Sequence, residues 1–181
     1  MTTLLRDTFT GADGTAIAAH MPNLGGPWIS DTPGFKIQGN RLGTTATSQE
    51  CHVDLPVGKT ARISATFDVG TLQEGDSFVL EWSDNNAQRV IVRFFSDHVE
   101  VEMRGAELVF NDSLWGGYGG GSTAFALNIG PGTVQFKLNK QSRVIASRVP
   151  IGCFPNVGFD INCQLASADT RCYLDNLTIT T

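Results

Sequence analysis

The stretch Arg89–Phe110, RVIVRFFSDHVEVEMRGAELVF, decides the fold class because apolar and polar residues alternate along it. Two alternating segments, 89–94 and 99–104, are separated by the turn formers Ser96 and Asp97. Alternation with a period of two is typical of strands that are buried on one face only. The residues expected on the buried face are Val90, Val92, Phe94, Val99, Val101 and Met103. The stretch therefore predicts two neighbouring antiparallel strands.

The same rhythm extends outward in both directions, and no convincing amphipathic helix interrupts it. Turn formers such as SDNN at 83–86 and NIGPG at 128–132 separate the alternating segments. Further strands are expected at 61–67, 78–82, 125–127, 134–138, 144–146, 157–161 and 172–179. About ten to thirteen short strands with frequent turns predict an antiparallel β-sandwich or barrel. Trp82 continues one apolar face and is expected in the core, as is Trp28.

The chain has 181 residues, which suits one domain. We expect a single β-sandwich domain over residues 1–181. Within it, residues 9–30, FTGADGTAIAAHMPNLGGPWIS, have weak periodicity and many turn formers. This segment is expected to be an irregular wrap that follows a first strand.

Charge and composition exclude two classes of partner. The net charge is −5, and the 13 Lys and Arg residues are scattered without a basic stripe, so no nucleic-acid partner is expected. No apolar run approaches the roughly 18 residues of a membrane span. The opening MTTLLRD lacks the features of a secretion signal, so we expect a protein that is made in a cytoplasm, or exported or released by a route that the sequence does not show.

Three motifs suggest a family: LLRDTFTGADGTAIAAHMPNLGGPWIS at 4–30, FKIQGNRL at 35–42 and CYLDNLTIT at 172–180. They resemble the ends of concanavalin A-like (laminin G-like) jelly-roll modules, which occur in structural proteins of tailed bacteriophages and in carbohydrate-binding modules. The resemblance is strongest over roughly the first 45 residues and the last ten. It implies an all-β jelly roll whose first and last strands pair, with glycan or protein binding on an exposed face or loop rim.

The resemblance also implies a setting. We expect a non-catalytic virion structural protein of a tailed phage: a capsid decoration, head-fibre or tail-associated protein on the virion surface, assembled in the host cytoplasm. Its expected partners are other virion proteins or further copies of itself in a homo-oligomer, and a surface glycan. Two alternatives stay open, a carbohydrate-binding module for host surface glycans and a glycan-degrading enzyme.

A glycine-rich stretch at 111–125, NDSLWGGYGGGSTAF, is the candidate binding loop. Trp115 and Tyr118 would serve as aromatic anchors for another subunit or for a sugar ring. Asn111 and Asp112 would hydrogen-bond sugar hydroxyls. The alternative is that both rings pack down onto the sandwich.

The candidate catalytic motif is HVEVEMRG, in which Glu100 and Glu102 occupy alternate positions of one strand. Alternate residues lie ~7 Å apart on a strand, which is within the range of inverting glycosidases. Related glucanases, however, carry an aspartate between their glutamates, and this chain does not. An ordinary half-exposed strand explains the alternation, so no enzyme is expected. EWSD, with Glu81 and Asp84, is a weaker candidate because Asp84 opens a turn.

No cofactor is expected except a structural calcium ion, which the resemblance to lectin-like modules implies. Its candidate ligands are Asp7, Asp13 and Asp175, near the paired ends of the chain. Calcium takes about six to eight oxygen ligands, so these three would need further donors.

The four cysteines lack the close spacing of a zinc site. Cys163 and Cys172 could face each other across a short hairpin and form a disulfide. Buried free thiols are the default expectation for a protein made in a cytoplasm.

Overall fold

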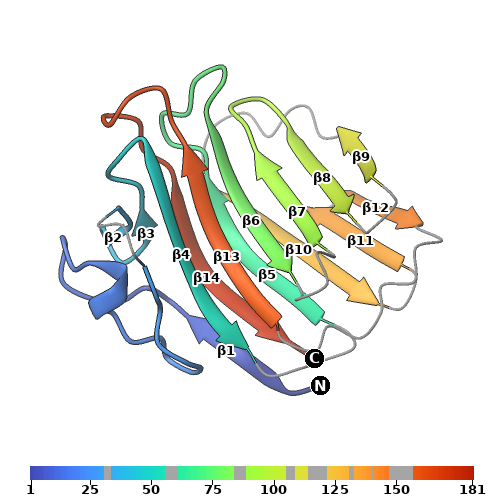
Figure 1. The fold of residues 1–181 in the computed structure, drawn as a ribbon, viewed down its shortest axis with the longest axis horizontal. Coiled ribbons are helices and arrows are strands. Elements are labelled where there is room, and N and C mark those ends of the chain that lie inside the picture. Colours follow the sequence, from blue (N-terminus) through green and yellow to red (C-terminus); the bar gives the residue numbers. More distant parts are fainter. Residues whose placement is uncertain are drawn as a thin grey trace.

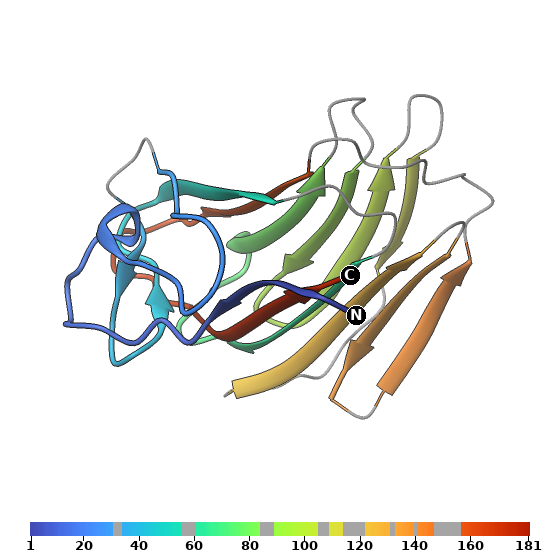
Figure 2. The same cartoon turned by 90° about the horizontal axis from the view of Figure 1, so that it is seen from below.

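A computed structural model describes most of the chain, and Figures 1 and 2 show it from two directions. The described residues are 1–30, 34–55, 61–83, 89–104, 109–113, 122–130, 133–139, 141–146 and 157–181. Within those ranges the strands β1 to β14 form two sheets whose paired strands are all antiparallel. The two sheets pack face to face, so the predicted all-β sandwich is confirmed.

The larger sheet contains eight strands in the order β12-β11-β10-β5-β14-β3-β2, and β1 also pairs with β14. Their bounds are β1 Thr3–Asp7, β2 Lys36–Ile37, β3 Leu42–Gly43, β5 Ala61–Asp68, β10 Ser122–Gly130, β11 Thr133–Leu138, β12 Gln141–Ala146 and β14 Tyr173–Thr180. The second sheet contains six strands in the order β4-β13-β6-β7-β8-β9. Their bounds are β4 Ser48–Leu55, β6 Ser77–Ser83, β7 Arg89–Phe94, β8 Val99–Arg104, β9 Val109–Ser113 and β13 Val157–Gln164.

The two ends of the chain lie side by side, as the resemblance implied (Figure 1). β1 pairs with β14 from Thr3, opposite Thr180, to Asp7, opposite Leu177. The backbone amide of Thr2 donates to the carbonyl of Thr181 at 2.9 Å, which extends the pairing to the terminus. The first and last strands are therefore neighbours in the eight-stranded sheet.

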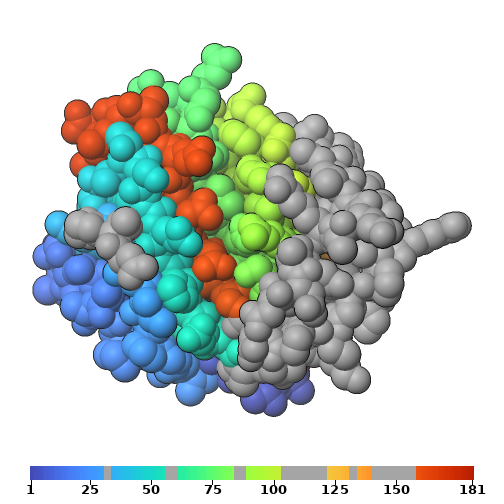
Figure 3. All heavy atoms as spheres, viewed as in Figure 1, coloured from blue at the N-terminus to red at the C-terminus, as the bar shows by residue number. Residues whose placement is uncertain are grey.

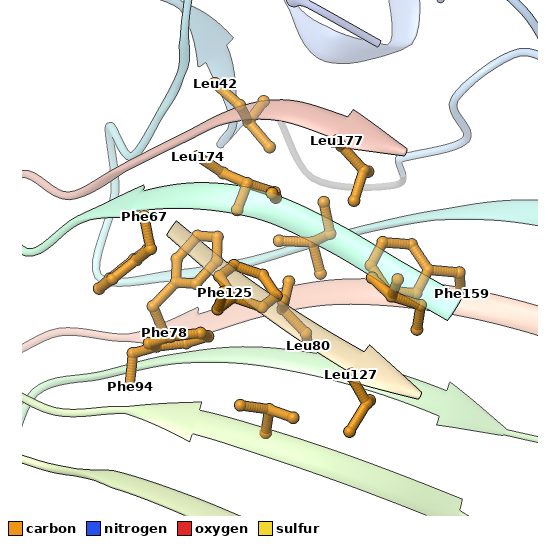
Figure 4. Close-up of a cluster of buried hydrophobic side chains, with 14 of the residues drawn as sticks. Leu42, Phe67, Phe78, Leu80, Phe94, Phe125, Leu127, Phe159, Leu174 and Leu177 are labelled. Carbon is orange, nitrogen blue, oxygen red and sulfur yellow. The ribbon is translucent and has the colours of Figure 1, made fainter. Parts of the chain in front are cut away.

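The predicted pair of strands at 89–104 is present as β7 and β8, with Val92 opposite Val101. The buried face of β7 packs against the larger sheet across an aromatic core (Figure 4), and Val99 and Val101 of β8 belong to the same buried cluster. Phe94 of β7 lies 4.3 Å from Phe67 of β5 and 5.0 Å from Phe125 of β10, measured between ring centroids. Burying a side chain of this size contributes about 1.5–3 kcal/mol. Packing across the two layers is therefore what holds the sandwich together.

The N-terminal wrap contains one short 3-10 helix, η1 at Ile17–Ala19, and is otherwise irregular. Isolated bridges attach it to the strands, with Leu24 opposite Arg6 and Ile29 opposite His52. Trp28 at its end is 2% exposed, and the expectation that it lies in the core is confirmed. No helix in the described ranges is long and apolar enough to cross a membrane.

The alternative of a hairpin disulfide between Cys163 and Cys172 is wrong, and the expectation of buried free thiols is confirmed for the described cysteines. Cys163 lies on β13 of the six-stranded sheet, whereas Cys172 precedes β14 of the eight-stranded sheet. Both residues and Cys51 are buried free thiols, and Cys153 lies outside the described residues. Burial raises the pKa of Cys163 to about 12, so its reactive thiolate form is scarce at neutral pH.

Candidate functional site on the outer face of the six-stranded sheet

Only part of the predicted binding loop can be placed. Trp115 and Tyr118 lie outside the described residues, so binding through them stays a prediction. Asn111 and Asp112 lie on β9, where their backbones pair with Glu102 and Val101 of β8. Asn111 is therefore in register with an outward-facing residue of the sheet.

The three predicted calcium ligands are placed, and the structure does not bring them together as a metal site. Asp7 is completely buried and is already used by protein donors. The exposed Asp13 accepts a hydrogen bond from the backbone amide of Gly39 at 2.7 Å, and Asp175 accepts one from that of Asn176 at 2.7 Å. Over the described part of the chain, no group of three or more His, Cys, Asp or Glu residues could hold a metal ion. The calcium ion stays a prediction.

Asp7 instead fastens the N-terminal wrap to the sandwich. Its carboxylate accepts hydrogen bonds from the Phe9 amide at 2.7 Å, from His20 Nε2 at 2.8 Å and from Trp28 Nε1 at 2.7 Å. Because an ionised carboxylate only accepts, Nε2 is the His20 nitrogen that carries the proton in this contact. The residues that carry the family resemblance at this end of the chain thus have a structural role.

The outer face of the six-stranded sheet collects the chemically active side chains. On each strand the alternate residues face the core, so the residues between them face outward, and the antiparallel register aligns these in rows. The central row contains His52, Asp160, Glu81, Ile91 and Glu102. The next row contains Glu50, Asn162, Val79, Arg93 and Glu100. Figure 3 shows this face, with atoms of β4, β13 and β6 running side by side across it.

Two arginines of β7 neutralise two of the outward carboxylates. Arg89 Nη1 lies 3.1 Å from Glu81 Oε1. Arg93 Nη1 hydrogen-bonds Glu102 Oε2, and the Glu102 side chain is only 4% exposed. Glu100 lies opposite Arg93 in the register, with its Oε1 3.7 Å from His98 Nε2.

Asp160 occupies the middle of the central row, between His52 and Glu81. Partial burial raises its pKa, with the nearby negative charge of Glu81 as the second cause, to about 6. His52 and a hydrogen bond from Ser83 act in the opposite direction. That hydrogen bond is long, 3.4 Å from Ser83 Oγ to Asp160 Oδ2. Since directly opposed residues have Cβ atoms about 4.5–5.5 Å apart, Asp160 and Glu81 form a pair of carboxylates on one face.

The sequence predicted part of this face. Glu100 and Glu102 do share the outward face of β8, but the carboxylate of Glu102 is committed to Arg93. The pair Asp160–Glu81 was missed because its members lie on strands far apart in the chain. The only local signal was the single acidic residue in the apolar alternation VGFDINCQ of β13. Asp84, named with Glu81 as the weaker candidate, lies outside the described residues.

No family model matches this sequence, and no curated protein matches it. Solved structures do match its fold. A β-1,3-glucanase from Mycobacterium marinum has a TM-score of 0.74 at 10% identity, over 99% of both chains. A glycosyl hydrolase family 16 protein from Mycobacterium smegmatis has a TM-score of 0.74 at 9% identity, over 99% of this chain and 100% of the other. A Mycobacterium tuberculosis antigen described as a pseudo β-1,3-glucanase has a TM-score of 0.67 at 13% identity, over 99% of this chain and 98% of the other.

These comparisons correct the expected function. The expectation of a virion structural protein is wrong, because the structures that share this fold over its whole length point to glycans and not to a phage particle. The expectation that the protein is not an enzyme is neither confirmed nor contradicted, because one neighbour is described as a glucanase and another as a pseudo-glucanase. At such low identity the likeness establishes architecture: this chain is a jelly-roll β-sandwich of the concanavalin A-like, glucanase-like type.

Proposed function

We propose that this protein binds a glycan on the outer face of its six-stranded sheet. The observation that carries the proposal is the central row, in which His52, Asp160, Glu81 and Glu102 come from four different strands and share one face. The glucanase-like structures that share the fold support a glycan as the ligand.

The chemistry of the face suits a sugar. Carboxylates accept hydrogen bonds from hydroxyls, and the Asn162 amide both donates and accepts. Val79 and Ile91, 7% and 3% exposed, place apolar groups among the polar ones. Ligand sites in proteins commonly combine apolar lining with a few polar groups that fix orientation.

Gly158 offers a way to block the face without disturbing the core. It lies on β13 opposite Ser83, and an added Cβ would meet only Asp160 Oδ2 and Ser83 Oγ, both at 3.7 Å, an ordinary contact distance. Gly158→Phe should therefore fold and place a ring beside Asp160, next to the central row. The matched control is Ala124→Phe, an exposed position of β10 on the other sheet.

The assay is calorimetric titration with neutral gluco- and galacto-oligosaccharides. We expect saturable binding by the wild type and the control, and at least about tenfold weaker binding by Gly158→Phe, since roughly 1.4 kcal/mol of lost contact corresponds to tenfold. Equal affinities in all three proteins would place the binding elsewhere. No binding to glycans of any class would refute the proposal.

A second candidate function, glycan hydrolysis, is favoured by one specific observation. Asp160, whose burial raises its pKa to about 6, stands beside Glu81, which is ion-paired with Arg89. A protonated acid beside an ionised carboxylate is the pairing that glycosidases use, and retaining enzymes place the two groups about 5–5.5 Å apart. Incubation with the same oligosaccharides and mass spectrometry of the products tests this function. Cleavage by the wild type that is abolished in Asp160→Asn would support hydrolysis. Intact substrate would refute hydrolysis and leave glycan binding as the function.

A further inference from the structure

We propose that this face selects glycans that carry a free amino group, as in glucosamine oligomers, over neutral and anionic ones. The inference rests on the proposed function and names its ligand class.

Among the described side chains of the outer face, carboxylates outnumber arginines. The outward carboxylates of the described residues are Glu50, Asp54, Glu81, Glu100, Glu102 and Asp160. On the same face, the described arginine side chains are those of Arg89 and Arg93, both on β7. An anionic sugar such as a uronate would meet like charge at Asp160, which is costly for binding.

Asp160 forms no ion pair with a cationic side chain among the described residues. Glu81 and Glu102 are held by arginines, whereas Asp160 accepts a single long hydrogen bond from Ser83. The charged groups nearest to it are Glu81 on one neighbouring strand, and His52 and Glu50 on the other. The positive charge of Arg89, two strands away, is used by Glu81.

A ligand can supply the missing positive charge. An ammonium group has three hydrogens to donate and no acceptor, so it can contact both members of a carboxylate pair. Hydrogen bonds between ionised partners are roughly twice as strong as neutral ones. A hydroxyl at the same position would donate one neutral hydrogen bond, and an N-acetyl group would offer one neutral N–H. The amino sugar therefore gains most from the Asp160–Glu81 pair.

Protonation of Asp160 should oppose this selectivity. Because its pKa is about 6, Asp160 is mostly ionised at pH 7 and mostly neutral at pH 5. This protonation weakens the attraction for an ammonium group as the pH falls, while the affinity for a neutral oligosaccharide falls much less.

The test compares tetramers of glucosamine, N-acetylglucosamine, glucose and galacturonate by calorimetry at pH 7 and pH 5. The values are corrected for titration of the amine in the free ligand. We expect the glucosamine tetramer to bind about tenfold more tightly than the glucose tetramer at pH 7, on the order of one charge-assisted hydrogen bond. The ratio of the affinity for the glucosamine tetramer to that for the glucose tetramer should be smaller at pH 5. It should approach one in Asp160→Asn, with folding checked by circular dichroism.

The outcomes separate the two proposals. Equal binding of the neutral and amino tetramers at pH 7, or preferred binding of galacturonate, would overturn the inference and leave glycan binding intact. Failure of every tetramer to bind would remove the proposed function and the inference with it. The pH dependence of the wild type tests the inference even where the variant does not fold.

Discussion

Replacing Asp7 by alanine should remove a large part of the stability of this protein, because the buried Asp7 carboxylate is the common acceptor of three donors. These are the amide of Phe9, Nε2 of His20 and Nε1 of Trp28, all within 2.8 Å of a carboxylate oxygen. Asp7 is 0% exposed, and His20 and Trp28 are 8% and 2% exposed, so water cannot easily replace the lost acceptor.

The magnitude follows from the number of donors left without a partner. Each buried group that loses its partner costs about 1–3 kcal/mol. Three such donors at Asp7→Ala give a loss of about 5 kcal/mol, comparable with the whole stability of a small domain at the low end of the usual range of about 5–15 kcal/mol. Trp28→Phe removes only one donor and leaves the other two bonds in place. Its expected loss is about 2 kcal/mol, the contribution of one hydrogen bond to a charged group.

Urea unfolding followed by fluorescence measures these losses, with the slope against urea compared between variants to confirm a common unfolded state. Asp13→Ala is the matched control, because this exposed aspartate accepts one hydrogen bond from Gly39. We expect a loss below about 1 kcal/mol there, as for surface substitutions generally. A loss at Asp7→Ala no larger than that of the control would refute the reasoning, and so would one smaller than that of Trp28→Phe.

Two further predictions concern other buried or half-buried groups. The pKa of Asp160 is raised to about 6 in the native protein, so the native fold binds this proton more tightly than the unfolded chain does. The contribution of Asp160 to the free energy of unfolding therefore falls as the pH rises from about 4 to 6. Asp160→Asn should therefore gain about 1 kcal/mol at pH 7 and little at pH 4 in urea unfolding, a value reduced for solvent screening of a partly exposed group; an equal gain at both pH values would contradict the assigned cause. Cys163 and Cys172 should resist iodoacetamide at pH 8 in the native protein and react in urea, as read by peptide mass spectrometry, because burial raises the pKa of both thiols. Labelling of either under native conditions would show that the core opens readily.

The fold class could be predicted because apolar and polar residues alternate along each strand, with the apolar residues facing the core and the polar ones facing outward. In β7, Val92 and Phe94 are completely buried while Arg93 between them is partly exposed, and that contrast is visible in the sequence. The pairing of strands is not recorded in this way. Cys163 and Cys172 are close in the chain and looked like a hairpin, but the chain crosses from one sheet to the other between them.

The candidate site was harder to predict for the same reason. Glu100 and Glu102 share a strand, so their common face follows from spacing alone. Asp160 and Glu81 become neighbours only because β13 inserts between β4 and β6. No local pattern of residues can reveal a contact that depends on sheet order. The predicted loop residues Trp115 and Tyr118 were found by composition, and they remain untested.

The loss of stability caused by keeping Asp160 ionised is an argument that this residue recognises a ligand. A half-buried carboxylate opposite Glu81 makes the native state less stable at neutral pH than a neutral residue at the same position would. Asp7 shows the contrary case, because its burial is offset by three donors and serves the fold. Asp160 has less compensation within the described residues, namely the neighbouring His52 and the long bond from Ser83. If Asp160→Asn is more stable at pH 7 and has also lost its preference for amino sugars, the same substitution ties the cost in stability to recognition. A more stable variant with unchanged preference would separate them.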